Sequence, residues 1–260
     1  MNIAVCVKQS VDTEAVITLD ENSQVVTEGA ALIIDPYAEF AVEKAVQIKE
    51  SLGGEVVLVT IGSQDCTPAI RHGLSMGADR AILIDDQEID DTNPTAKAEV
   101  LAKVMQELNP DLIMGGCKSG DTSHGQTMPR LSAILDMPQV NLAVDLEFEG
   151  NEMIASHECE NGIEKISMTL PAVVSAQQGL ALPRYPSVMN IMKSKKKPLE
   201  VKSLADLGIE ASTVDASAAQ VLVKSYALKP ERSGGRIVEG EAPEAVAQTT
   251  SLLVNEAKVL

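Results

Sequence analysis

A run of small and hydroxylated residues, Gly115–Thr127 (GGCKSGDTSHGQT), is the part of the sequence best suited to hold a phosphate. It follows an apolar segment, Asp111–Met114, and precedes a predicted helix. Backbone N–H groups in such a loop, together with the positive end of the helix dipole, favour an anion. Thr122, Ser123 and Thr127 can add hydroxyl donors. The loop matches neither a Walker A motif nor a GxGxxG fingerprint, and loops of this composition are often plain connections, so both interpretations stay open.

Two other loops are predicted at the same edge of a sheet. The strand-like runs that end at Val7 and Ile61 are followed by Lys8 and by Gly62 with Ser63. In an open parallel sheet, ligands bind beyond the carboxyl ends of the strands, where the strand order switches. We therefore expect Lys8 to add positive charge to the phosphate site.

The elements that would position these loops alternate between strands and helices. Apolar runs at 3–7, 55–61, 81–84 and 111–114 predict buried parallel strands, and helical spacing predicts helices over 36–52, 67–76 and 94–108. Asp35-Pro36 and Asn93-Pro94 each supply an N-cap followed by a proline. Residues 10–29 are expected to form an excursion with a hairpin. The predicted fold class is α/β: a Rossmann-like, mostly parallel sheet of the adenine-nucleotide-binding type, with helices on both faces.

The pattern changes after residue 138. Residues 140–148, 153–158 and 165–170 read as antiparallel strands joined by Gly-Asn and Asn-Gly turns, and residues 172–176 return to a core strand. From about residue 200 the apolar positions are too sparse for a separate core, and a last helix is predicted over 243–258. We expect a nucleotide-binding domain over residues 1–200 and a C-terminal arm over 201–260 that packs on a partner protein.

Composition excludes several classes of function. A formal net charge of −17 and an aromatic content of 2% argue against binding nucleic acid. The four cysteines are too widely spaced for a disulfide framework or a zinc site, and no metal site is predicted. The first residues lack the pattern of a secretory signal, and no apolar stretch approaches membrane-spanning length. We expect a cytoplasmic protein, or a mitochondrial-matrix one in a eukaryote.

Nothing in the sequence supports catalysis by this chain alone. The three histidines are isolated from one another, and only His124 lies in the candidate phosphate loop, where it either contacts the ligand or is solvated. No nucleophile or metal-ligand motif is present. We expect a protein that makes and breaks no substrate bonds.

Residues 183–201 (PRYPSVMNIMKSKKKPLEV) combine prolines, apolar residues and a lysine cluster. Bulky apolar groups beside clustered cations are costly to bury together, so the segment is predicted to be an exposed loop and a docking surface. The lysines would speed encounter with an acidic partner. The alternative is that Val188, Met189 and Met192 simply cover the sheet.

Residues 183–201, together with residues 162–179, resemble the beta subunit of electron transfer flavoproteins. The match rests on residues 183–201 and on GIEKISMTLPAVVSAQQG (Gly162–Gly179). VCVKQ (Val5–Gln9), DPYAEFAVEKAVQIKE (Asp35–Glu50) and GADRA (Gly77–Ala81) follow the family's order and spacing, so the resemblance covers nearly the whole chain.

The resemblance implies that the loop binds AMP, or a second FAD in electron-bifurcating members. Gly116, Asp121, Gln126 and Thr127 match the family pattern, whereas Cys117 and Lys118 depart from it. Met128 stands where many relatives have glycine, and its bulk would narrow the space for an isoalloxazine ring, which favours AMP. The candidate cofactor-binding residues are Cys6, Val7, Lys8, Asp35, Gly62, Gly116, Cys117, Asp121, Thr122, Ser123, Gln126 and Thr127.

The resemblance also implies partners. An alpha subunit would form a heterodimer with this chain and hold the redox-active FAD, and the C-terminal arm would pack on it. Electrons would pass from an acyl-CoA dehydrogenase to a membrane quinone oxidoreductase or a similar acceptor. Val188 aligns with the family's apolar anchor, and Arg184 with Tyr185 would hold the base of the loop. The candidate docking residues are Arg184, Tyr185, Val188, Ile191, Met192, Lys193 and Lys195.

Two alternatives stay open. An electron-bifurcating beta subunit would bind its own FAD and oxidise NADH, and only the identity of the ligand separates it from a simple carrier. A free-standing ATP-binding α/β protein would give the docking segment and the arm no role.

Overall fold

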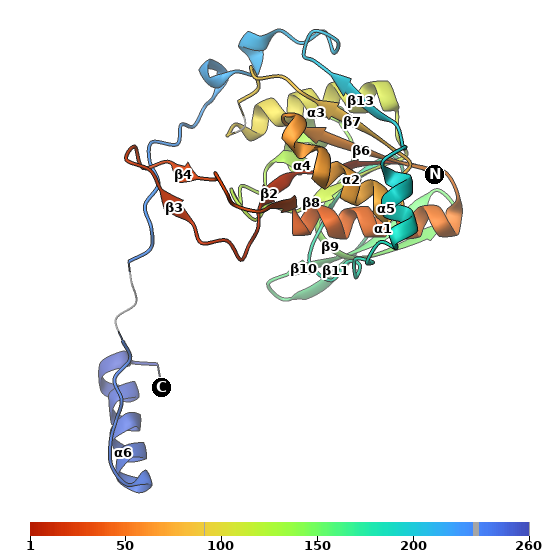
Figure 1. Cartoon of the computed structure of the whole chain (residues 1–260). Helices are drawn as coiled ribbons and strands as arrows, with labels where there is room; N and C mark the ends of the chain where they lie inside the picture. The colour runs from red at the N-terminus through yellow and green to blue at the C-terminus, as the bar shows by residue number, and fades with distance from the viewer. Residues whose placement is uncertain (91, 231–233, 260) are drawn as a thin grey trace. The chain divides into compact units, whose positions relative to one another are not determined.

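The computed structural model describes residues 1–90, 92–230 and 234–259, in two compact units, Met1–Ser225 and Tyr226–Leu260. The first unit is built on a nine-stranded sheet (Figure 1). Its strands lie in the order β11 (Gly162–Thr169), β10 (Glu152–Cys159), β9 (Gln139–Glu149), β12 (Ala172–Ala176), β8 (Leu112–Gly116), β1 (Asn2–Cys6), β6 (Glu55–Ile61), β7 (Arg80–Ile84) and β13 (Leu199–Lys202). All neighbours from β9 to β13 pair in parallel, and β10 and β11 add an antiparallel extension.

Helices cover both faces of this sheet, as predicted. On one face α1 (Pro36–Leu52) and α2 (Thr67–Met76) share a core with Val56 and Leu58 of β6. On the other face α3 (Pro94–Leu108) and α4 (Thr127–Leu135) share a core with Val57 and Val59. Successive residues of a strand point to opposite faces, so a strand buried on both sides must be apolar throughout, which is the pattern of β6.

The predicted helix boundaries follow from their capping residues. The Asp35 carboxylate accepts a hydrogen bond from the N–H of Tyr37 at 3.0 Å, and Pro36 is the first residue of α1. Gly53, at φ 75°, ends the helix in a conformation that favours glycine. The side chain of Asn93 accepts from the N–H of Thr95 at 3.0 Å and begins α3 in the same way.

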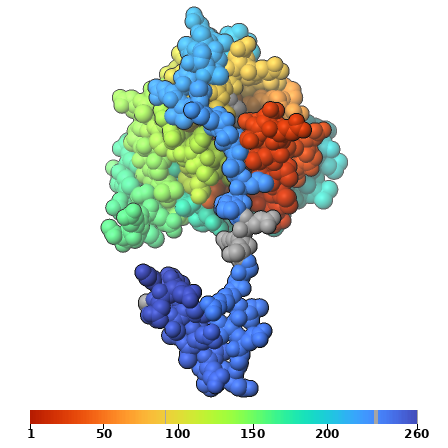
Figure 2. Space-filling view, turned by 90° about the vertical axis from the view of Figure 1, so that its left-hand side faces the viewer, coloured from red at the N-terminus to blue at the C-terminus, as the bar shows by residue number. Residues whose placement is uncertain are grey.

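The excursion and the antiparallel strands are also confirmed. β3 (Thr18–Leu19) and β4 (Val25–Val26) form the predicted hairpin, at the end of a ribbon made by β2 (Gln9–Val11) and β5 (Leu32–Ile34). Figure 2 shows this region, in red, at the surface of the first unit. Beyond the prediction, β9 also pairs in parallel with β12, which joins the antiparallel extension to the central sheet.

The compact unit extends beyond the expected boundary near residue 200. β13 pairs in parallel with β7, and Leu204, Leu207 and Val214 are buried in the core beneath α3 and α4. These apolar residues are few, but each completes an existing core rather than building a new one, which moves the boundary to Ser225. Short helical turns of this unit lie at Gln64–Cys66, Ala211–Thr213 and Ala216–Ala218.

The second unit contains α6 (Ala242–Leu252), which continues into a π-helical turn at Leu253–Ala257. None of the residues of α6 is buried. None of the helices in the described part of the chain is long and apolar enough to cross a membrane.

The docking segment (residues 183–201) differs from the exposed loop that was predicted. Residues Val188–Ser194 form a short helix, α5, and residues 199–202 form β13. The Ser187 hydroxyl accepts a hydrogen bond from the N–H of Asn190 at 3.2 Å and caps α5. A serine N-cap ahead of unbranched methionines therefore sets a helix where the prolines and lysines had suggested a loop.

Candidate nucleotide site

The candidate site lies where the strand order switches. β1 is flanked by β6 and β8: the chain moves from β1 to β6 and β7 on one side and then returns with β8 on the other. A cavity of about 820 Å³, counting space open to solvent, lies against the carboxyl ends of these strands. Its lining comprises Cys6, Val7, Lys8, Asp35, Ala38, Val59, Ile61, Pro94, Lys97, Leu101, Gly116, Cys117, Lys118, Ser119, Thr122, His124, Gly125, Gln126, Thr127 and Met128.

Most of the predicted cofactor-binding residues meet in this lining, and three do not. Asp121 forms an ion pair with Lys8 instead. Ser123, at φ 51°, donates its N–H to the Ser119 carbonyl at 3.1 Å and shapes the loop. Gly62 donates its N–H to the Ile84 carbonyl at 3.0 Å, and a Cβ there would lie 2.5 Å from the sulfur of Cys66. Gly62 thus allows the chain after β6 to pack closely against Cys66.

The positive end of α4 borders the cavity. Thr127 and Met128 are its first residues, both line the cavity, and no side chain caps this terminus. The first N–H groups of a helix have no acceptor within the helix, and they carry partial positive charge. The start of α4 can therefore offer backbone donors to an anion.

Asp35 connects the cavity loop to α1. One carboxylate oxygen caps α1, and the other accepts a hydrogen bond from the N–H of Gly120 at 2.7 Å. The residue is 1% exposed, and burial raises the pKa of its carboxyl. Because both oxygens are engaged by backbone N–H groups, Asp35 positions the loop rather than leaving a free acceptor for a ligand.

Lys8 lines the cavity and forms an ion pair with an acidic residue of the loop. Its ammonium lies 2.7 Å from the Asp121 carboxylate. Burial acts to raise the pKa of Asp121, but the hydrogen bonds it accepts, Lys8 first among them, hold that pKa below its usual range. A bound phosphate would therefore share Lys8 with Asp121.

The two thiols of the cavity are poor nucleophiles. Burial raises the pKa of Cys6 to about 12 and also raises the pKa of Cys117. The thiolate is the reactive form, so both groups stay protonated and unreactive at neutral pH. None of the four cysteines, all of which lie in the described part of the chain, forms a disulfide.

Several lining residues were missed by the sequence prediction. Pro94, Lys97 and Leu101 come from α3 and present one helical face to the cavity. Their i, i+3, i+7 spacing could have indicated that face. Lys118 lies 5.3 Å from the ring centroid of Tyr37, within the range of a cation–π contact. The lining thus combines apolar walls from Val59, Ile61, Leu101 and Met128 with donors along the loop 116–127.

Gly116→Ala is expected to disturb this site, because a Cβ at that position would lie 2.7 Å from the Cβ of Tyr37 and 3.0 Å from the N of Ala38. The backbone must shift, at a cost of about 1–3 kcal/mol in the free energy of unfolding, and the nucleotide retained on purification should fall. Gly120→Ala is the matched control in the same loop, since its nearest neighbour would be 3.4 Å away. Equal unfolding midpoints and nucleotide contents for the two variants would contradict this account.

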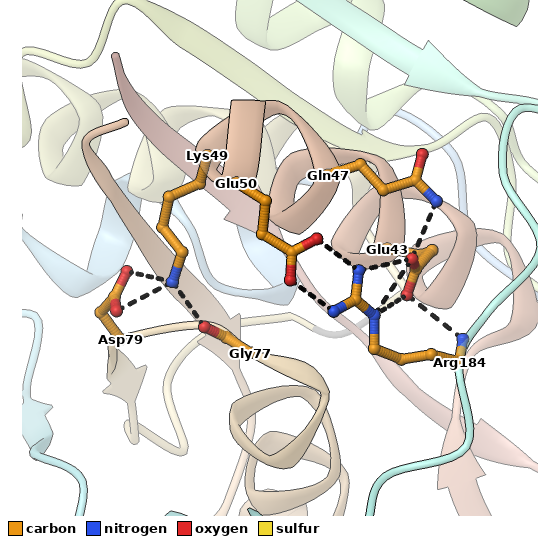
Figure 3. Close-up of polar contacts among 7 residues, drawn as sticks. All are labelled: Glu43, Gln47, Lys49, Glu50, Gly77, Asp79 and Arg184. Atoms are coloured by element: carbon orange, nitrogen blue, oxygen red, sulfur yellow. Dashed lines mark hydrogen bonds and ion pairs between the residues drawn. The ribbon is translucent and has the colours of Figure 1, made fainter. Parts of the chain in front are cut away.

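The candidate docking residues lie on one exposed segment. Tyr185 is 100% exposed and Val188 76%, and Met189, Ile191, Met192, Lys193 and Lys195 are exposed as well. Arg184 instead turns back onto α1 (Figure 3). Its guanidinium forms ion pairs with Glu43 at 2.9 Å and Glu50 at 2.6 Å. The hydrogen bonds that Arg184 donates to Glu50 and then to Glu43 raise the pKa of its guanidinium, so it stays charged.

Comparisons with known proteins agree with this architecture. Residues 23–207 match the model of the electron transfer flavoprotein domain. The chain is 39% identical to the electron transfer flavoprotein subunit beta of Bacillus subtilis over 100% of both chains. It is 35% identical to the subunit beta of Syntrophomonas wolfei over 100% of this chain and 98% of that protein. The human subunit beta is 35% identical over 92% of this chain and 93% of its own. The chain belongs to the electron transfer flavoprotein family and is a beta-subunit member of it.

Proposed function

We propose that this chain binds AMP in the cavity at the ends of β1, β6 and β8. The adenine would lie against the apolar walls, and the phosphate would accept hydrogen bonds from the first N–H groups of α4. Thr122, Thr127 and Lys8 would add donors. The observation that carries this proposal is the uncapped start of α4, lining an otherwise largely apolar cavity at the switch in strand order.

Met128 favours AMP over a second FAD. It is buried, and its sulfur lies 2.6 Å from the position that a Cβ on Gly115 would take. The Met128 side chain therefore fills the space above the end of β8, which an isoalloxazine ring would need if it extended past the loop. The alternative, an electron-bifurcating subunit with its own FAD that oxidises NADH, requires this side chain to move.

We propose an alpha subunit as the constant partner, forming a heterodimer in which that subunit holds the redox-active FAD. The second unit of this chain supports an interface role, because Ile237, Val246 and Val259 are exposed and α6 has no buried residue. A helix that buries nothing gains little stability alone, and exposed apolar side chains indicate an interaction surface. This unit would pack on the alpha subunit.

The docking segment would contact an acyl-CoA dehydrogenase, and the complex would deliver electrons to a quinone oxidoreductase or a similar acceptor. Val188, Met189 and Met192 form exposed apolar anchors, and the exposed Lys193, Lys195 and Lys196 follow them directly in the chain. An apolar centre within a charged rim is the common form of a protein–protein hot spot. In this role the chain makes and breaks no substrate bonds. Its four cysteines, none of which forms a disulfide, fit a reducing compartment, the cytoplasm or the mitochondrial matrix.

The test is the nucleotide content of the heterodimer, measured by denaturing extraction and chromatography. We expect one FAD and one AMP per heterodimer, and we expect Gly116→Ala to lose AMP while retaining FAD. Two FAD and no AMP would identify the bifurcating alternative. ATP bound to this chain alone, with no heterodimer, would identify the free-standing ATP-binding alternative and overturn the carrier proposal.

A further inference from the structure

Two cations, Arg71 of α2 and Lys197 of the docking segment, hold the C-terminal end of the segment against α2. Arg71 of α2 donates to the carbonyl oxygens of Ser194 at 2.6 Å and of Lys197 at 2.8 Å. In return, the Lys197 ammonium donates to the carbonyl of Leu74 at 2.9 Å and to the carbonyl of Ala78. Each side of the contact therefore supplies both a charged donor and backbone acceptors.

Of the two acceptors used by Lys197, Leu74 lies in the last turn of α2, which ends at Met76, and Ala78 lies just beyond it. The last carbonyls of a helix have no donor within the helix and carry partial negative charge, so an ammonium is well placed there. Lys49 of α1 occupies the neighbouring position: it donates to the Gly77 carbonyl at 2.7 Å and pairs with Asp79 at 3.0 Å (Figure 3). Together the two lysines bind carbonyls at and just beyond the end of α2, and they join this region to α1 and to the docking segment.

Lys197 differs in this respect from the other lysines of its cluster. Lys193, Lys195 and Lys196 are exposed, whereas Lys197 is half-buried. Burial lowers the pKa of Lys197; the Asp79 carboxylate acts to raise it, and the ammonium groups of Lys49 and Lys193 act to lower it. The lysine run thus contains one residue directed into the fold and three that face solvent.

The other end of the segment is held by Arg184, through Glu43 and Glu50 of α1. Between these two attachments α5 carries Val188, Met189 and Met192 at the surface. We propose that Arg71 and Lys197 are positioning residues that fix α5 on α2, so that its apolar anchors meet the dehydrogenase in one geometry, while Lys193, Lys195 and Lys196 attract it. This inference rests on the proposed docking function.

Fixing the segment before binding reduces the conformational freedom that is lost in the complex, and so increases affinity. Loss of the attachment should therefore weaken docking without slowing electron transfer inside the complex. Loss of an exposed lysine should instead reduce the salt dependence of association. Loss of Lys197 should therefore weaken docking without changing the salt dependence, whereas loss of an exposed lysine should change the salt dependence.

The experiment compares Lys197→Met, Lys197→Arg and Lys195→Met in the intact heterodimer. Amide hydrogen exchange of residues 190–197 reports the attachment, and flavin reduction by an acyl-CoA dehydrogenase, at several salt concentrations, reports docking. For Lys197→Met we expect exchange about tenfold faster and KM about tenfold higher, with kcat and the salt dependence unchanged. Lys197→Arg should restore part of the protection from hydrogen exchange, and part of the increase in KM should disappear. Lys195→Met should leave exchange unchanged and flatten the salt dependence.

Unchanged exchange of α5 in Lys197→Met would overturn the proposal. Exchange of the α3 amides serves as the check on folding, and Arg71→Met should reproduce the result from the other side of the contact. Faster exchange with an unchanged KM would also overturn the positioning role. Val188→Asp in the same assay then separates the causes: if it too leaves KM and kcat unchanged, docking itself is absent, and if it abolishes reduction, only the positioning role has failed.

Discussion

Val188→Asp is expected to reduce kcat/KM for reduction by the dehydrogenase at least about 100-fold, while the heterodimer and its nucleotide stay intact. Val188 is 76% exposed, so the substitution removes little from the core of the free protein. In the docked complex, however, a carboxylate would replace an apolar anchor in a desolvated pocket, which is strongly unfavourable. The measurement is steady-state flavin reduction by the dehydrogenase, with gel filtration and nucleotide extraction alongside.

Ile163→Asp is the matched control. Ile163 lies on the edge strand β11 and is 65% exposed, and the substitution adds the same charge to a different surface. We expect its kcat/KM to stay within about threefold of the parent, since surface substitutions away from an interface have small effects. If both variants transfer electrons like the parent, the docking segment does not contact the dehydrogenase. If both fail, the added negative charge rather than the loss of an anchor is responsible.

Local signals made much of the fold predictable from the sequence. Asp35-Pro36 and Asn93-Pro94 carry their own capping chemistry, so the starts of α1 and α3 could be named to the residue. The continuous apolar run of β6 required burial on both faces, and this placed it inside a parallel sheet. Parallel strands ending at Cys6, Ile61 and Gly116 then brought their loops to one edge, which is why most of the predicted cofactor-binding residues share a cavity.

What could not be predicted depends on contacts between distant residues. Leu204, Leu207 and Val214 look too sparse to form a core, and only the packing of α3 and α4 shows which core they complete. Lys197 cannot be distinguished from Lys196 by composition, because the difference is the carbonyls of α2 within its reach. The spacing of Lys97 and Leu101 places them on one face of α3, but only the fold shows that this face lines the cavity.

Arg184→Met is expected to lower the free energy of unfolding by about 3 kcal/mol, because it leaves the buried carboxylate of Glu43 without its cation. The Glu43 side chain is 3% exposed, whereas that of Arg184 is 33% exposed, so the desolvation cost falls mainly on the glutamate. Gln47 still donates to Glu43 at 2.8 Å, but a neutral amide does not balance the charge. Urea unfolding of the heterodimer measures the change. Lys165→Met is the control: the Lys165–Glu147 pair is exposed on both sides and should contribute at most about 1 kcal/mol.

The double variant Arg184→Met/Glu43→Met separates loss of an ion pair from loss of a structural arginine. If the cost of Arg184→Met arises from an unpaired buried charge, replacing Glu43 as well should recover much of the stability, since apolar side chains can fill the same space. If the double variant is as unstable as the single one, the essential contact is instead the pair with Glu50, which is more exposed and whose pKa Arg184 lowers by hydrogen bonding. A single variant no less stable than Lys165→Met would mean that neither pair holds the segment. The position of α5 would then depend on Arg71 and Lys197 alone. In that case Lys197→Met should show a correspondingly larger loss of hydrogen-exchange protection in α5.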